Sequence, residues 1–126
     1  MNTPETRSYA IRAQSTTTHG RVMCSVRNHH FIVDGPVQNG APGEAVTPAE
    51  LFLTGIAACG VELVQSFAKA EGMPLRAIDV NVAGMMDRAK PVRQDVSVFN
   101  AVHIQFALAG VTAAQGAALI DRFKAR

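Results

Sequence analysis

Hydrophobic and polar positions alternate along four short segments of the chain, with the period of a half-buried strand, and Phe31–Val33 is a further short strand of apolar residues. The clearest segment has apolar side chains at every second residue from Val102 to Leu108, with His103 and Gln105 between them. Arg27–His30 is the expected turn between the second and third strands. The five predicted strands are residues 9–13, 22–27, 31–33, 78–86 and 102–108.

A long helix is expected after the third strand and a loop rich in glycine and proline, Asp34–Thr47. The Thr47 hydroxyl can accept a hydrogen bond from the amide of Glu50, and the Glu50 carboxylate can accept one from the amide of Thr47. Pro48 suits the first helical position, and the helix should end near Glu71. One stripe of this helix carries Phe52, Ile56, Cys59, Leu63, Ser66, Phe67 and Ala70.

A second helix follows the last strand, because Thr112–Gln115 repeats the capping pattern. Its apolar side is expected at Leu119, Ile120 and Phe123. In each half of the chain, strands follow one another directly, which favours antiparallel hairpins and an α+β fold over a doubly wound parallel sheet. We expect a single domain over residues 1–126.

Composition narrows the functional classes. Of the 126 residues, 48% are hydrophobic and 17% charged, which indicates a folded protein with apolar surface to bury in an oligomer. The net charge is +2 and the cations are scattered, so no nucleic-acid partner is expected. We expect no membrane span, since no run of 18 apolar residues occurs. Met1–Gln14 lacks the apolar core of a signal peptide, which favours the cytoplasm.

The two cysteines, Cys24 and Cys59, are expected to be thiols in a reducing cytosol. Neither belongs to a Cys-x-x-Cys motif, and the four histidines have no zinc-binding spacing. We therefore expect no metal and no other cofactor.

Four segments resemble the OsmC/Ohr family (osmotically induced protein C and organic hydroperoxide resistance). The most specific is 47–59, a proline-acidic-leucine helix start followed by small residues and Ala-Ala-Cys. Residues 34–36, 70–75 and 102–110 match the family more weakly. The resemblance covers nearly the whole chain. It implies an OsmC-like α+β fold in which antiparallel sheets wrap around central helices in an intertwined homodimer.

The resemblance also implies an activity. Family members reduce organic hydroperoxides with a thiolate on the central helix, held by an arginine and a glutamate. A second cysteine then forms a disulfide, and dithiols such as lipoylated proteins supply the electrons. Here Cys59 stands at the peroxidatic position, where the chemistry requires a thiolate. Glu62, one turn further on, disfavours that ionised form, so a cation must come from elsewhere.

Arg21 resembles the arginine of the family's Gly-Gly-Arg segment and is the candidate thiolate partner. The alternative is a surface strand arginine. The family glutamate lies ten residues before the cysteine, where this chain has Ala49. Glu50 is the neighbouring candidate, but nine residues place it on the opposite side of the helix from Cys59, which favours a capping role.

The family's second cysteine has no counterpart before the end of the sequence at Arg126. Cys24 can act as a substitute resolving thiol or as a small buried hydrophobe. Cys59 itself can be reactive or a core thiol, and the apolar stripe around it can line a peroxide pocket or the core of a dimer.

The main hypothesis is a thiol-dependent peroxidase. The rivals are an inactive protein that binds a small ligand or a partner, and a one-cysteine redox sensor.

Overall fold

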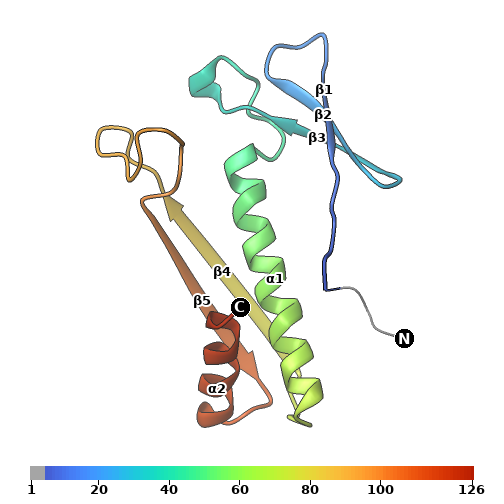
Figure 1. Ribbon diagram of the computed structural model, residues 1–126, viewed down its shortest axis with the longest axis vertical. Coiled ribbons are helices and arrows are strands. Elements are labelled where there is room, and N and C mark those ends of the chain that lie inside the picture. Colours follow the sequence, from blue (N-terminus) through green and yellow to red (C-terminus); the bar gives the residue numbers. More distant parts are fainter. Residues whose placement is uncertain (1–4) are drawn as a thin grey trace. The chain divides into compact units, whose positions relative to one another are not determined.

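The structure is a computed structural model that describes residues 5–126 (Figure 1). The chain divides into two compact units, residues 1–51 and 52–126. The mixed α+β class with antiparallel sheets is confirmed. The elements are β1 (Arg12–Ser15), β2 (Arg21–Val26), β3 (His29–Asp34), the 3₁₀ turn η1 (Val37–Asn39), α1 (Pro48–Ala70), β4 (Ala77–Met85), β5 (Ala101–Ala109) and α2 (Ala113–Lys124).

The first unit contains an antiparallel sheet in the order β1-β2-β3. Cys24 lies in the central strand, opposite Ala13 on one side and Phe31 on the other. Its side chain is buried, as is that of Val33. Cys24 is therefore a core residue of this sheet, which is the structural role that the sequence left open for it.

Two strand boundaries differ from the prediction. β1 begins at Arg12, so Tyr9 and Ile11 precede it and are 85% and 68% exposed. The turn after β2 is also tighter than predicted. Arg27 adopts φ 53°, a left-handed conformation that closes a hairpin in two residues. His29 and His30 therefore belong to β3, where they pair with Val26 and Ser25 instead of forming the turn.

The loop after β3 packs closely against the start of β2. Gly35 donates a backbone hydrogen bond of 2.8 Å to the carbonyl of Gly20. Gly20 has φ +79°, and a Cβ there would lie 2.2 Å from the Cβ of buried Ala41. Only glycine allows both this conformation and this approach, so the segment leading into α1 is held against the sheet.

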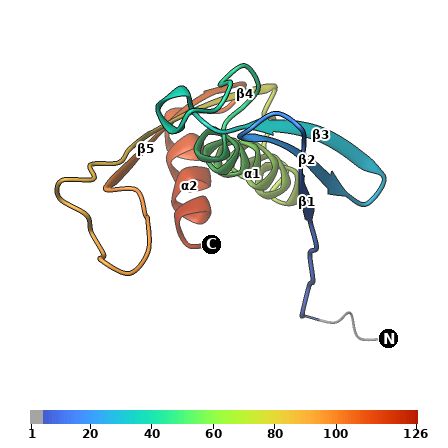
Figure 2. The ribbon, with the colours of Figure 1, turned by 90° about the horizontal axis from the view of Figure 1, so that it is seen from above.

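The second unit is built on the β4–β5 hairpin, with Ile78 opposite Leu108. Both α1 and α2 lie on the same face of this hairpin (Figures 1 and 2). The buried residues of this core come from the two helices: Val64, Phe67 and Ala68 from α1, and Leu119 from α2. They pack against apolar side chains of both strands, including Ile78, Phe106 and Leu108.

α1 forms as the sequence predicts. Gly72 follows its last turn with φ +66°, and the amide of Met73 donates to the carbonyl of Ala68, which is a common helix ending. The buried stripe, however, is rotated from the predicted one. It contains Gly60, Val64, Phe67 and Ala68, whereas Phe52, Cys59, Ser66 and Ala70 are exposed.

α1 is also long and apolar enough to cross a membrane, judged by length and composition alone. The expectation that the chain has no membrane span stays a prediction. Core helices of soluble proteins pass the same test, and α1 packs as a core helix against β4 and β5. Only 22% of its most apolar window is buried, so much of the apolar surface of α1 stays uncovered.

Candidate functional site

The thiol of Cys59 lies on the exposed side of α1. Its neighbour Gly60 faces the hairpin, where a Cβ would come within 3.4 Å of the Phe106 ring. One residue corresponds to about 100° of helix rotation, so Cys59 is turned away from that contact. Cys59 is therefore not part of the core of residues 52–126, and α1 presents its thiol at the surface of that unit.

Apolar groups share the exposed face with Cys59. Phe52 precedes it by two turns and is 60% exposed. The Phe52 ring stacks on that of Phe99, with centroids 5.8 Å apart and an interplanar angle of 25°. Phe67, also proposed as a pocket residue, is buried in the core instead. Of these two aromatic residues of the predicted stripe, Phe52 is exposed and Phe67 is buried.

Arg21, the proposed thiolate partner, is bound to two carboxylates. Its Nε and Nη2 atoms donate to Oδ1 and Oδ2 of Asp34, each at 2.9 Å. Nη2 also lies 3.3 Å from Oε1 of Glu44. The Arg21 side chain is 31% exposed. Arg21 is thus neither a free surface cation nor a fully buried one, and its guanidinium is fixed in orientation by a bidentate pair.

Asp34 is the centre of this cluster. Its side chain is fully buried, and Oδ2 accepts hydrogen bonds from the amides of Glu44 and Ala45, at 3.0 and 2.8 Å. The hydrogen bond from Arg21, helped by these two amides, holds the pKa of Asp34 well below its usual range, although burial acts in the opposite direction. The same hydrogen bond raises the pKa of Arg21. Asp34 is therefore an ionised, fully satisfied anchor.

Asp34 and Glu44 are not among the site residues predicted from the sequence. In the sequence, Asp34 stands out only as part of residues 34–36, which resemble the family. The observed pairing of β2 and β3 brings the ion pair together, since Arg21 and Asp34 lie directly opposite each other. Opposite charges at such positions attract across a sheet.

Glu50 has the capping role. Its Oε1 accepts hydrogen bonds from the amide and hydroxyl of Thr47, at 3.0 and 2.9 Å. The Thr47 hydroxyl in turn accepts from the amide of Glu50 at 3.4 Å. The hydrogen bond from the Thr47 amide lowers the pKa of Glu50. Arg21 and Glu50 lie in residues 1–51 and Cys59 in residues 52–126, so their action on Cys59 stays a prediction.

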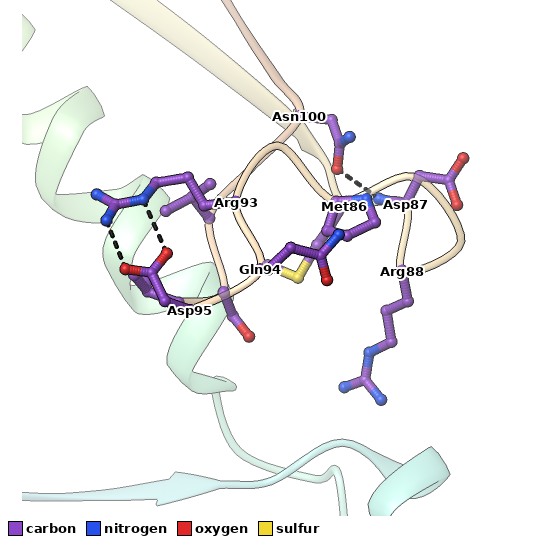
Figure 3. Close-up of a pocket in the computed structure, with 11 residues that line it drawn as sticks. Met86, Asp87, Arg88, Arg93, Gln94, Asp95 and Asn100 are labelled. Atoms are coloured by element: carbon purple, nitrogen blue, oxygen red, sulfur yellow. Dashed lines mark hydrogen bonds and ion pairs between the residues drawn. The ribbon is translucent and has the colours of Figure 1, made fainter.

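A cavity of about 460 Å³ lies within the loop between β4 and β5. Asn100 shapes this loop by accepting a hydrogen bond from the amide of Asp87 and donating one to the carbonyl of Lys90, both at 2.7 Å. Figure 3 shows this bond to Asp87 and, across the loop, the ion pair of Arg93 with Asp95. Cys59 does not line this cavity. Within residues 5–126, no three His, Cys, Asp or Glu side chains converge as metal ligands.

Fold and thiol together define an α+β protein that exposes a cysteine on its central helix. Residues 41–126 match the OsmC-like protein family, and the chain belongs to that family. No curated protein matches the chain.

Solved structures agree with this assignment. The OsmC-like protein of Mycoplasma pneumoniae is 16% identical with a TM-score of 0.80, and the match covers 95% of this chain and 82% of that one. The organic hydroperoxide resistance protein OsmC of Legionella pneumophila is 20% identical with a TM-score of 0.67, covering 91% and 80%. The organic hydroperoxide resistance protein of Elizabethkingia anophelis is 17% identical with a TM-score of 0.67, covering 94% and 82%. At these identities the likeness establishes the fold.

Proposed function

We propose that this protein is a thiol-dependent peroxidase that reduces organic hydroperoxides, with Cys59 as the peroxidatic residue. The observation that carries the proposal is the exposed thiol of Cys59 on α1, in a family whose solved members include organic hydroperoxide resistance proteins. Peroxide reduction requires a thiol that the substrate can reach. Cys59 meets that requirement, whereas Cys24 is buried in the sheet.

In the oxidative half of the reaction, the Cys59 thiolate attacks the distal oxygen of the hydroperoxide. An S–O bond forms as the O–O bond breaks, and the alkoxide takes up a proton and leaves as the alcohol. Cys59 is left as a sulfenic acid. A guanidinium at the thiolate favours the ionised nucleophile, and Arg21 is the candidate for that role. Phe52 and Phe99 offer apolar surface to the organic part of the substrate.

In the reductive half, an external dithiol restores Cys59. One of its thiols attacks the sulfenic sulfur and displaces water, which leaves a mixed disulfide. The second thiol then displaces the Cys59 sulfur, and the reductant departs as a cyclic disulfide. The buried position of Cys24 supports an external reductant over an internal disulfide. The expected compartment is the reducing cytoplasm, where dithiol reductants are maintained.

The uncovered apolar surface of α1 supports the homodimer as the working form. Leu51 and Phe52 are 38% and 60% exposed, and 22% of the most apolar window of α1 is buried. Large exposed apolar patches are rare on monomeric soluble proteins. A second copy of the chain would cover this surface and complete the environment of Cys59.

The proposal is tested by the consumption of cumene hydroperoxide with dihydrolipoamide or glutathione as reductant. The wild type should turn over, preferentially with the dithiol. Cys59→Ser should lose turnover because it lacks the nucleophile, and a sulfenic acid should be trapped by dimedone only in proteins that retain Cys59. Cys24→Ser is the matched control and should keep its activity. Peroxide consumption by Cys59→Ser equal to that of the wild type would refute the assignment.

The second candidate function is a non-catalytic member of the family that binds a small ligand or a partner. The pairing of Arg21 with both Asp34 and Glu44 favours it, because two carboxylates already compensate that cation. A wild-type protein that neither consumes peroxide nor yields a dimedone adduct would support this function over the first. Oxidation of Cys59 without turnover would indicate a redox sensor.

A further inference from the structure

A second cavity, of about 290 Å³, lies in the second unit where the chain turns from α1 into β4, at the lower end of both elements in Figure 1. Backbone hydrogen bonds fix its walls on both sides. The amide of Met73 donates to the carbonyl of Ala68 at the end of α1, and the amide of Arg76 donates to the carbonyl of Ala109 in β5. The cavity is therefore preformed, and its volume is close to the lower end of the range for small-molecule sites.

Apolar side chains form the inner wall of this cavity. Ala68 is 2% exposed, and Met73, Leu75 and Ile78 are partly buried against the core of the second unit. Transfer of hydrocarbon from water to such a wall is favourable. A ligand with a short hydrocarbon chain would therefore gain free energy by placing the chain here.

Two exposed cations, Lys69 and Arg76, also line the cavity. The neutral amide of Gln65 lies beside them, and no acidic residue of the described chain belongs to the lining. Within residues 5–126, neither cationic side chain makes a hydrogen bond or an ion pair. Three other arginines of the chain each bind a carboxylate. The cavity thus combines an apolar wall with two positive charges that no anion compensates.

A helix C-terminus attracts cations, and this is the alternative role of Lys69. The last carbonyls of α1 are already used, however, since those of Phe67, Ala68 and Lys69 accept hydrogen bonds from the amides of residues 71–73. Arg76 lies beyond the helix, one residue before β4, where the helix dipole requires no cation. The dipole therefore explains one cation and leaves the pair, at a shared cavity, unexplained.

We propose that this cavity binds a small monocarboxylate with a short hydrocarbon chain. The planar guanidinium of Arg76 suits two parallel hydrogen bonds to the carboxylate, and the ammonium of Lys69 adds a second positive charge. The hydrocarbon chain packs on the apolar wall. Cys59 does not line the cavity, so this site is separate from the proposed peroxidase site and requires no reaction of Cys59.

The test titrates the full-length protein with sodium octanoate by calorimetry and follows the backbone amide shifts by NMR. Octanoate should bind saturably, with the largest shifts between residues 65 and 78. Each methylene added between butyrate and octanoate should tighten binding about two- to fourfold while the chain stays within the cavity. Acetate lacks the chain and octanol lacks the charge, so both should bind more weakly than octanoate.

Two variants test the cations. Arg76→Met should weaken octanoate binding about ten- to a hundredfold, because it removes charge-assisted hydrogen bonds. Lys69→Met should weaken binding less, since a lysine ammonium is a flexible and strongly hydrated point charge. Arg88→Met is the matched control: it removes an exposed arginine of the β4–β5 loop that does not line this cavity, and it should leave the affinity unchanged. The chain-length series uses the wild type alone and does not depend on the folding of any variant.

Four outcomes would overturn the inference. They are the absence of saturable octanoate binding, amide shifts centred outside residues 65–78, inorganic phosphate or octanol binding as tightly as octanoate, and equal weakening by Arg76→Met and Arg88→Met. The last result would indicate an effect of net charge alone. Cys59→Ser should bind octanoate as the wild type does, so the outcome for this cavity and the outcome for the peroxidase can be told apart.

Discussion

Arg21 binds one carboxylate that water cannot reach and a second that it can. Asp34 is fully buried and Glu44 is 78% exposed, although both contact the same guanidinium. A buried ion pair whose remaining lone pairs are satisfied costs a great deal to break from one side, while an exposed pair contributes little. The two acidic residues therefore contribute unequally to the stability of the first unit.

Acid should weaken the first unit through Asp34. Its pKa is depressed in the folded state, so its contribution to stability is complete above the unfolded value of about 3.9 and declines as the pH falls below it. Asp34→Asn should therefore be less stable than the wild type at pH 7, and the gap should narrow towards pH 2.5. Urea unfolding at both pH values measures the difference in the free energy of unfolding between the two proteins. A difference that stays constant with pH would show that the charge of Asp34 does not contribute to stability.

The ion pair could not be foreseen because it depends on the strand register. A four-residue turn at Arg27–His30 would place Pro36 opposite Arg21. The observed two-residue turn places Asp34 there, since the left-handed Arg27 closes the hairpin earlier. A small change in turn length thus decides which residue faces Arg21. The sequence contains both charges but no local signal for the conformation of Arg27.

At the scale of elements, the helices were the most predictable part of the fold. Both begin at a threonine whose side chain and backbone exchange hydrogen bonds with the residue three positions on, Glu50 in α1 and Gln115 in α2. Such caps are local and can be read from four residues. The face that α1 buries was less predictable, because it includes the close approach of Gly60 to Phe106, which a hydrophobicity pattern does not register.

Leu119 joins the helices to the hairpin, and its replacement should destabilise the second unit. Its side chain is fully buried in the cluster with Val64, Phe67 and Ala68. Leu119→Ala should lower the free energy of unfolding by about 2–5 kcal/mol, as is typical of a deleted core leucine. Val92→Ala, at a position that is 61% exposed in the β4–β5 loop, is the control and should stay within about 0.5 kcal/mol. Equal losses of stability for the two variants in thermal or urea unfolding would contradict the assignment of Leu119 to the core.

At the scale of the whole molecule, the proposed homodimer follows from the exposed side of α1. Light scattering should give a mass about twice the 13.4 kDa of one chain. Phe52→Glu should shift the equilibrium towards the monomer, because it places a charge on the apolar face that a partner would cover. Lys69→Glu changes an exposed charge on the same helix and should leave the mass unchanged. A wild-type mass of a single chain at all concentrations would exclude the dimer.

The different exposure of the two thiols allows unfolding of the first unit to be followed by thiol labelling. Cys59 is exposed in the second unit, while Cys24 is buried on the central strand of the β1-β2-β3 sheet in the first. A maleimide should therefore label one sulfhydryl per chain at once and the other only when the sheet separates. Under conditions in which labelling is faster than reclosing, the delay of the second label measures how often the first unit unfolds. The measurement needs no engineered probe, since Cys59 gives the reference labelling rate and Cys24 reports the unfolding of the first unit.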